Sequence, residues 1–280
     1  MPAPTDAPDL DSNTLESRIE FARQIVWQQR ERLEADLGRV ESAWKPDGSR
    51  ITETDHAISN AILGELAVTF PDDLGLSEEL QIEAPLEVTS RFAWVLDPID
   101  GTNNFASGMA ECAIALGLFE NGQPVYGVIY DAARRVLMHG GPGRGMWDGE
   151  REATVSGTPL SASSSVGFHS PRARGKYPGH GEAIVGRYKV RAMGSSALHL
   201  AYVAAGLLDG VVDHNVKIWD IAAAIPLLMA AGGELRFLSA SPLPLRHFDL
   251  AMSSIVYVGG SAANAAELSR VLTDAHPVEF

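Results

Sequence analysis

The first quarter of the chain carries apolar residues at helical spacing. From Leu15 to Leu37 they return at intervals of one or two helical turns, which is typical of one face of an α-helix. The apolar positions are Leu15, Ile19, Ala22, Val26, Leu33 and Leu37. We expect Asn13-x-x-Glu16 to begin this helix as a capping box.

A second helix is predicted directly after a turn at residues 44–48. Thr52-x-x-Asp55 has the pattern of a helix start, and Pro71 is a stop signal. The apolar residues between them fall on one face: Ile58, Ile62, Leu66 and Phe70.

The middle of the chain has short apolar runs, which favour strands. Residues 92–96 form such a run and end at Asp97-Pro98, as a buried strand would. Further strands are expected at 112–119, 125–130 and 136–139, with Asn121-Gly122 as a hairpin turn between the first two. The glycine-rich segment 140–149 is expected to be a loop that leaves this meander.

The last part of the chain alternates between strand and helix patterns, which indicates an α/β arrangement. Strands are expected at 183–190, 210–213, 234–238 and 255–258, and helices at 195–205, 219–231 and 262–273. The Ser- and Gly-rich segment 156–165 is the candidate boundary between two halves. We therefore predict an α+β domain at 13–155 and an α/β domain at 156–280.

Composition narrows the class of protein. The formal net charge of −14 argues against nucleic acid as the main partner, because phosphate backbones require Lys and Arg. Residues 1–12 lack the basic and apolar regions of a signal peptide and are expected to be disordered, and the apolar stretch 221–231 is too short for a membrane span. The single cysteine, Cys112, excludes an internal disulfide and suits the cytoplasm.

The strongest chemical signal is Asp97-Pro98-Ile99-Asp100-Gly101-Thr102, at the end of the strand predicted for 92–96. Two carboxylates on either side of a Pro-Ile corner can converge on one point, and the corner frees the Ile99 carbonyl as a third oxygen ligand. Oxygen ligands alone suit a hard cation such as Mg²⁺. Backbone N–H groups of Gly101 and Thr102 could bind an anion if a helix starts there. A lone Asp-Gly would instead indicate an ordinary turn.

Two further acidic positions are candidates for the same site. Ser77-Glu78-Glu79 precedes the strand that carries Asp97, although adjacent acids are usually solvated. Asp220 follows Trp219 at the start of an Ala-rich helix, where an acid is often only a partner for the helix dipole. One Asp pair cannot fill two coordination spheres, so additional carboxylates are expected close by.

Together these segments resemble the inositol monophosphatase family, within the lithium-sensitive, magnesium-dependent carbohydrate phosphatases. The resemblance covers most of the chain. It is carried by Asp97-Pro98-Ile99-Asp100-Gly101-Thr102, Glu78-Glu79, Thr54-Asp55, Gly194-Ser195-Ser196-Ala197 and Trp219-Asp220-Ile221-Ala222-Ala223. It implies a layered αβαβα sandwich, a homodimer, and hydrolysis of a small phosphate monoester by water that Mg²⁺ activates.

The resemblance also implies a role for each matched residue. Glu78, Asp97 and the Ile99 carbonyl would hold a first Mg²⁺, and Asp97, Asp100 and Asp220 a second, while Glu78 would share a weaker third ion. Thr102 and Asp55 would orient and deprotonate the attacking water, and the Gly101 and Thr102 N–H groups would hold the phosphate. Ser195, Ser196 and Asp213 would contact the rest of the substrate. Lys45 lies in the loop that closes over the metals in relatives.

Departures from the family pattern leave the substrate open. Ser77 replaces a Gly, Ala224 replaces a frequent Gly, Ser196 is larger than the common Ala, and Asp213 is shorter than the frequent Glu. An acidic Asp213 in the pocket favours a polyol and disfavours a second phosphate. We expect inositol monophosphate, with histidinol phosphate, fructose 1,6-bisphosphate and 3′-phosphonucleotides as alternatives. From another class, a non-catalytic regulatory binding protein is the rival. His169, His180, His199 and His214 show no close metal-ligand pairing and are expected to be structural or exposed.

Overall fold

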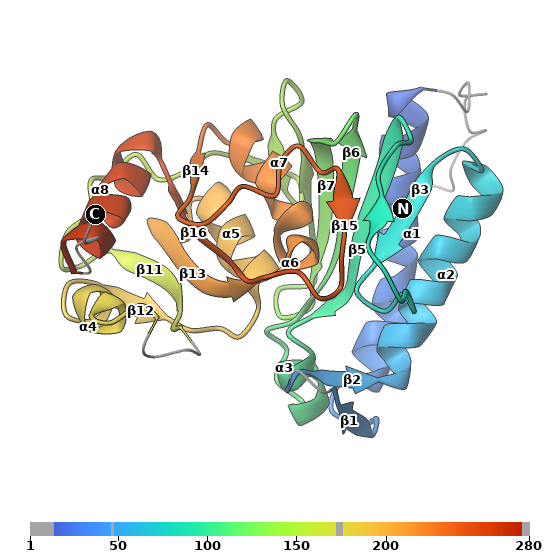
Figure 1. Ribbon diagram of the computed structural model, residues 1–280, viewed down its shortest axis with the longest axis horizontal. Coiled ribbons are helices and arrows are strands. Elements are labelled where there is room, and N and C mark those ends of the chain that lie inside the picture. The colour runs from blue at the N-terminus through green and yellow to red at the C-terminus, as the bar shows by residue number, and fades with distance from the viewer. Residues whose placement is uncertain (1–13, 46–47, 172–175, 276–280) are drawn as a thin grey trace.

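Five layers of helix and sheet make up the molecule (Figure 1). The computed structural model describes residues 14–45, 48–171 and 176–275. Two sheets, one of seven and one of five strands, are separated by a layer of helices and covered by further helices on their outer faces. This arrangement confirms the predicted layered αβαβα sandwich.

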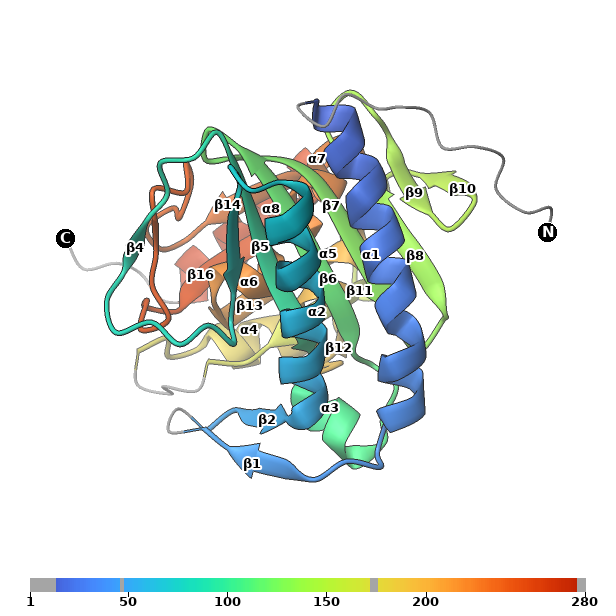
Figure 2. The same ribbon diagram turned by 90° about the vertical axis from the view of Figure 1, so that its right-hand side faces the viewer.

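The first outer layer consists of two long helices, α1 (Leu15–Asp36) and α2 (Glu53–Thr69), which lie side by side on the seven-stranded sheet (Figure 2). The cap of α1 is Thr14, whose hydroxyl accepts the Ser17 N–H at 3.2 Å, and the predicted cap Asn13 lies outside the described residues. The predicted capping box of α2 is present, because Asp55 accepts the Thr52 N–H at 2.8 Å. A small hairpin, β1 (Ser42–Trp44) with β2 (Arg50–Thr52), connects the two helices.

The seven-stranded sheet has the order β10-β9-β8-β7-β6-β5-β3 and is antiparallel except for the parallel pair β3 and β5. Its strands are β3 (Leu74–Ser77), β5 (Phe92–Asp100), β6 (Ala113–Glu120), β7 (Gln123–Asp131), β8 (Val136–Gly140), β9 (Met146–Asp148) and β10 (Arg151–Ala153). The meander β5 to β8 is the one predicted. The segment 140–149 is not only a loop, because β9 forms within it.

The five-stranded sheet has the order β12-β11-β13-β16-β14, with β11 parallel to both its neighbours. Its strands are β11 (Ser165–His169), β12 (Lys189–Arg191), β13 (Gly210–Val216), β14 (Glu234–Phe237) and β16 (Ile255–Gly260). A two-stranded pair of β4 (Leu86–Glu87) and β15 (His247–Phe248) joins distant parts of the chain. The strand predicted for 183–190 is wrong, because residues 180–185 form helix α4 (His180–Val185), which packs against α8 (Ala262–Ala275) on the outer face.

Between the sheets lie α5 (Ser196–Ala204), α6 (Ile218–Ala222) and α7 (Ala224–Ala230). The single helix predicted for 219–231 is thus two helices. Pro226 cannot donate a backbone hydrogen bond, and it is tolerated here because it falls in the first turn of α7, where N–H groups need no helical partner. A short helix, α3 (Thr102–Ser107), follows β5 directly.

Buried apolar side chains of the described residues form three clusters: one between the two sheets around the central helices, and one under the outer helices of each sheet. The cluster between the sheets includes residues from both predicted domains, such as Val95 and Trp219. The division into domains at 156–165 therefore stays a prediction. No helix in the described ranges is long and apolar enough to cross a membrane.

Candidate active site

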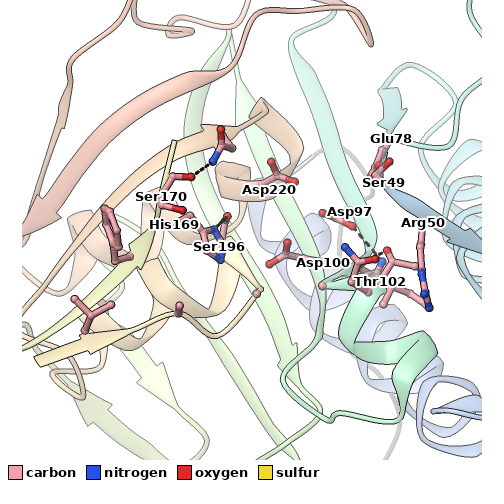
Figure 3. Close-up of a pocket in the computed structure, with 18 of the residues that line it drawn as sticks. Ser49, Arg50, Glu78, Asp97, Asp100, Thr102, His169, Ser170, Ser196 and Asp220 are labelled. Atoms are coloured by element: carbon pink, nitrogen blue, oxygen red, sulfur yellow. Dashed lines mark hydrogen bonds between the residues drawn. The ribbon is translucent and has the colours of Figure 1, made fainter. Parts of the chain in front are cut away.

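A cavity of about 660 Å³ opens where the end of β5 faces the helices between the sheets. One side carries Glu78, Asp97, Asp100 and Asp220, and the other side carries His169 and Ser196 (Figure 3). The acidic residues that the sequence singled out are thus brought to one place.

The end of β5 is irregular, and this irregularity brings Asp97 and Asp100 together. In a regular strand, residues three apart point to opposite faces. Here the register with β6 shifts between Asp97 and Asp100, at the Pro98-Ile99 corner. As a result, carboxylate oxygens of both residues approach the same point. The turn then requires Gly101, whose φ is +90° and where a Cβ would lie 2.9 Å from the Glu111 carbonyl oxygen.

Asp220 reaches the same point because α6 lies unusually close to the sheet. A Cβ on Gly117 of β6 would lie 2.7 Å from the Ala222 carbonyl, and one on Gly127 of β7 would lie 1.8 Å from the Ala223 carbonyl oxygen. These two glycines allow the helix backbone to rest on the strands. Asp220, in the first turn of α6, also accepts the Lys217 N–H at 2.6 Å, which fixes its carboxylate.

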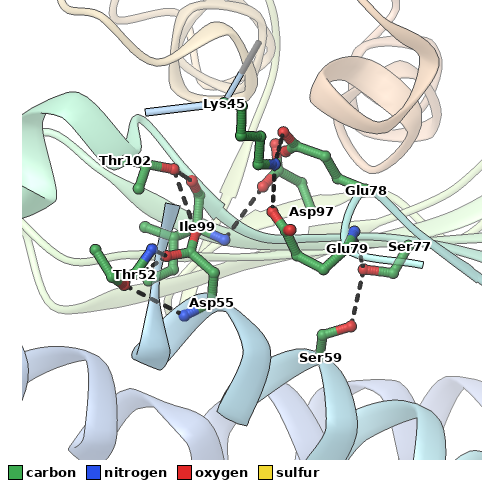
Figure 4. A network of polar contacts seen from close by, with 10 residues as sticks. All are labelled: Lys45, Thr52, Asp55, Ser59, Ser77, Glu78, Glu79, Asp97, Ile99 and Thr102. Atoms are coloured by element: carbon green, nitrogen blue, oxygen red, sulfur yellow. Dashed lines mark hydrogen bonds and ion pairs between the residues drawn. The ribbon is translucent and has the colours of Figure 1, made fainter. Parts of the chain in front are cut away.

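Glu78 follows β3, and its carboxylate is paired with a lysine from the β1–β2 hairpin (Figure 4). Lys45 Nζ lies 2.8 Å from Glu78 and 2.7 Å from Glu79. Burial opposes the charge of this lysine, but both glutamates raise its pKa above the ordinary value. Ser77 is the last residue of β3, directly before the acids, and accepts a hydrogen bond from Ser59 at 2.9 Å.

Thr102 and Asp55 are in contact at the edge of the cavity (Figure 4). The Thr102 hydroxyl lies 3.2 Å from Asp55 Oδ1 and 2.9 Å from the Ile99 carbonyl oxygen. Because the other Asp55 oxygen accepts the N–H and hydroxyl of Thr52, Oδ1 remains directed at Thr102. Burial, opposed by the Thr52 hydrogen bonds, raises the pKa of Asp55 to about 6.

The acidic cluster carries more negative charge than its surroundings balance. Burial, followed by the charges of Glu78 and Asp100, raises the pKa of Asp97 well above its ordinary value. Burial and the charge of Asp100 do the same to Asp220. Burial raises the pKa of Asp100 to about 6, although hydrogen bonds from Ser195 and Ala197 oppose this shift.

These residues fit a hard divalent cation. Oxygens of Asp97, Asp100 and Asp220 all lie within 4.8 Å of one another, and the nearby Ile99 carbonyl also lines the cavity. Only oxygen atoms are offered, which is the donor set that Mg²⁺ or Ca²⁺ prefers. A bound cation would supply the missing positive charge and reverse the shifts in pKa.

The three predicted substrate contacts lie in different environments. Ser196 lines the cavity, but Ser195 and Asp213 are fully buried and do not. The Ser195 hydroxyl caps α5 and donates to Asp100, whose same oxygen accepts the Ala197 N–H at 2.7 Å. The N-terminus of α5 therefore holds a proposed metal ligand.

His169 and Arg50 also line the cavity, which was not predicted. His169 ends β11, a strand that was not predicted, and Arg50 lies in the β1–β2 hairpin. No spacing in the sequence indicates either residue, because each reaches the cavity only through the packing of the layers.

Comparison with known proteins agrees with this geometry. The model of the inositol monophosphatase family matches residues 11–275. An inositol-1-monophosphatase, ImpA, of Mycolicibacterium smegmatis is 34% identical over 221 residues, which cover 73% of this chain and 76% of that protein. The Nus factor SuhB of Xylella fastidiosa is 31% identical over 227 residues, covering 79% and 80%.

A solved IMPase structure from Thermotoga maritima superposes with a TM-score of 0.76 at 26% identity, covering 92% of this chain and 98% of that one. The family match spans both sheets and every acidic residue of the cavity. The chain therefore belongs to the inositol monophosphatase family and is a phosphoric monoester hydrolase.

Proposed function

We propose that the protein hydrolyses a small phosphate monoester of a polyol in the presence of Mg²⁺, with inositol monophosphate as the first candidate. The observation that carries this proposal is the convergence of Asp97, Asp100 and Asp220 beside the contact between Thr102 and Asp55. Carboxylates alone would repel a phosphate, so the arrangement is suited to phosphate only with cations between them.

In this proposal the acidic residues hold the cations. Glu78, Asp97 and the Ile99 carbonyl form one site, and Asp97, Asp100 and Asp220 form another. When bound, Mg²⁺ supplies positive charge that stabilises the negative charge developing on the phosphoryl and leaving oxygens. Gly101 and Thr102 offer backbone N–H groups to the phosphate. Lys45, from the hairpin that borders the cavity, partly neutralises Glu78.

Thr102 and Asp55 position and deprotonate the attacking water. A base is most effective when its pKa lies near the working pH, and the Asp55 value of about 6 meets this condition. Asp55 accepts a hydrogen bond from the Thr102 hydroxyl, which leaves the threonine oxygen free to accept one from water. The proton then moves toward the Asp55 carboxylate.

The experiment is release of inorganic phosphate by EDTA-treated protein, with and without added Mg²⁺. The panel contains inositol 1-phosphate, histidinol phosphate, fructose 1,6-bisphosphate and a 3′-phosphonucleotide, and Asp97→Asn is the inactive control. We expect no activity without metal, and the highest kcat/KM for inositol 1-phosphate with Mg²⁺. Full activity in verified metal-free protein would reject the role of the cations, and no release from any substrate would favour the non-catalytic alternative.

Three further properties belong to the same proposal and come from the family. We propose inhibition by millimolar Li⁺, a homodimer and a cytoplasmic location. Lithium is tested in the same assay, and light scattering gives the oligomeric state.

A further inference from the structure

Asp213 was expected to contact the substrate, but it lies behind the wall of the cavity. Its side chain has no exposed surface, and the residue is not among those that line the cavity. One carboxylate oxygen, Oδ2, lies 3.0 Å from His169 Nδ1 and 3.0 Å from Ser196 Oγ. The other, Oδ1, lies 3.4 Å from the Asn215 N–H. Its hydrogen-bonding capacity is thus engaged within the protein.

The ionised form of Asp213 is stabilised by its neighbours within the protein. Although burial opposes ionisation, His169 and His199 hold the pKa of Asp213 well below its ordinary value. An ionised carboxylate only accepts hydrogen bonds, so Nδ1 of His169 is the donor to Oδ2. This carboxylate therefore differs from the acidic cluster across the cavity, where no neighbouring cation balances the aspartates.

His169, His199 and Asp213 do not form a second metal site, although their ligand atoms lie within 4.8 Å of one another. The Met193 N–H donates to Nε2 of His199 at 3.1 Å, and burial lowers the pKa of this histidine, so the ring is neutral. A neutral ring that accepts at Nε2 carries its hydrogen on Nδ1. Nδ1 of His199 lies 3.8 Å from Asp213 Oδ2. The hydrogen on Nδ1 occupies the position that a metal ion would need for binding to this nitrogen.

The surface that faces the substrate is therefore made by the partners of Asp213. His169 has 22% of its side chain exposed, and it lines the cavity together with Ser196 (Figure 3). Both contact the same buried oxygen, and Ser196 Oγ lies 3.1 Å from His169 Nδ1. The three groups form one hydrogen-bonded unit in which His169 and Ser196 lie between the carboxylate and the cavity.

We propose that His169 determines specificity for the leaving group by covering Asp213, and that Asp213 is a positioning residue that holds both His169 and Ser196. The inference rests on the proposed phosphatase function. A leaving group with an ammonium ion gains no carboxylate contact here, so the site does not favour amine-bearing leaving groups over uncharged, hydroxylated ones. Histidinol phosphate was an alternative because an exposed Asp213 would attract its amine, and the covered position of Asp213 removes this reason. It also removes the expected repulsion of a second phosphate by Asp213.

The test uses glucose 6-phosphate and glucosamine 6-phosphate, which differ only by a hydroxyl and an ammonium group. We expect the wild-type enzyme to hydrolyse them with kcat/KM values within about threefold of each other, less than one charge-assisted hydrogen bond would produce. His169→Ala removes the ring that covers Asp213, so preference for the amine should rise by about tenfold or more. The change should appear in KM, because the contact would form in the ground state. The double variant His169→Ala/Asp213→Asn should lose the preference.

Two controls separate masking from structural damage. Ser196→Ala keeps the ring over Asp213, so its ratio should stay near that of the wild type. If His169→Ala does not fold, the wild-type ratio still decides: a preference of about tenfold for the amine that Asp213→Asn abolishes would overturn the proposal. Where neither sugar is turned over, their inhibition constants against inositol 1-phosphate give the same ratio. Absence of phosphatase activity in the wild-type protein, on inositol 1-phosphate as well as on both sugars, would instead reject the proposed function.

Discussion

Two groups of buried carboxylates lie on either side of one cavity, and their surroundings shift their pKa values in opposite directions. Asp97, Asp100 and Asp220 are close to one another, and their mutual repulsion adds to the effect of burial in raising the pKa. Asp213 has two histidines beside it, and its pKa falls. The first group requires a cation from solution, whereas the second is complete within the protein.

An acidic residue close to the cavity is thus not necessarily exposed to it, since Asp213 is fully buried and does not line the cavity. What decides its role is the set of groups that face its oxygens. Asp220 points at other carboxylates and so is suited to bind metal. Asp213 points at His169 and Ser196 and so is suited to hold them in place.

The largest expected difference between the two groups is in activity. Asp220→Asn removes a charge from the proposed metal site, and we expect kcat to fall by about 10³-fold or more, because stabilisation of the transition state is lost. Asp213→Asn should keep kcat within about tenfold but lower the free energy of unfolding by about 1–3 kcal/mol, since a buried hydrogen-bonded charge is lost. Steady-state kinetics with Mg²⁺ and urea unfolding measure both effects. A folded Asp220→Asn protein with normal kcat would remove this residue from the site.

A smaller loss of activity is expected on the acidic side from Thr102. Thr102→Ala removes the hydroxyl that contacts Asp55, and kcat should fall by about 10²-fold, the usual contribution of a positioned proton-transfer group. The half-saturating Mg²⁺ concentration should change little, since the hydroxyl is not a proposed ligand. Thr102→Ser keeps the hydroxyl and should retain most of the activity. Equal losses in both variants would show that the methyl group, and not the hydroxyl, matters.

The two groups should also respond differently to pH in the metal-free protein. A carboxylate with a raised pKa binds more protons when folded, so it stabilises the fold as the pH falls from about 7 to about 5. The acidic cluster should therefore add about 1–3 kcal/mol to the free energy of unfolding over this range. Asp213, with a lowered pKa, contributes stability above its ordinary value of 3.8 and loses it only below that value.

The measurement is urea unfolding at several pH values with EDTA and with saturating Mg²⁺. Burial lowers the pKa of His139 to about 4, so this residue destabilises the fold as the pH falls below about 6.5. Its contribution is the same in both series and cancels in their difference. Stabilisation by Mg²⁺ should be largest near pH 7 and decline as the pH falls toward about 5. If the stabilisation by Mg²⁺ did not depend on pH, this would contradict the predicted charge imbalance of the acidic cluster.

The smallest effect is expected from Tyr257, which lies in the field of both groups. Its hydroxyl is fully buried and makes no hydrogen bond within the described part of the chain. Tyr257→Phe should therefore change the free energy of unfolding by less than about 0.5 kcal/mol, or raise it slightly. The matched control is Tyr202→Phe, which removes a 2.7 Å hydrogen bond to Asp131 and should destabilise the fold by about 1 kcal/mol or more. Similar losses in both variants would indicate that Tyr257 has a partner, such as ordered water.

Much of the fold could be predicted from periodicity. The long helices α1 and α2 and the strands β5 to β8 have regular apolar patterns, and all were expected. Some short elements, such as α4 and β11, were not expected. Residues 183–185 are apolar in sequence, but of these three only Ala183 and Ile184 are buried in α4, while Val185 is exposed. A run of this length does not distinguish a strand from a helix.

The strand β11 was missed because its sequence fits the packing against neighbouring elements and does not follow a regular strand pattern. Gly167, in its centre, weakens any strand pattern, yet a Cβ there would lie 3.2 Å from the His199 ring. For the candidate site, Asp97 and Asp220 could each be identified because each lies in a short contiguous motif. The pairing of His169 with Asp213 could not, since it depends on the parallel register of β11 and β13, which places these two residues opposite each other.

The close contact of α6 with Gly117 and Gly127 also has a consequence for how the protein is made. The ribosome synthesises Asp97 and Asp100 more than a hundred residues before Asp220, which at about 5–20 residues per second is an interval on the order of ten seconds. During this time the first sheet can form, but the helix that rests on its glycines and completes the acidic cluster does not yet exist. The nascent chain therefore acquires the full proposed ligand set only after Asp220 has been synthesised.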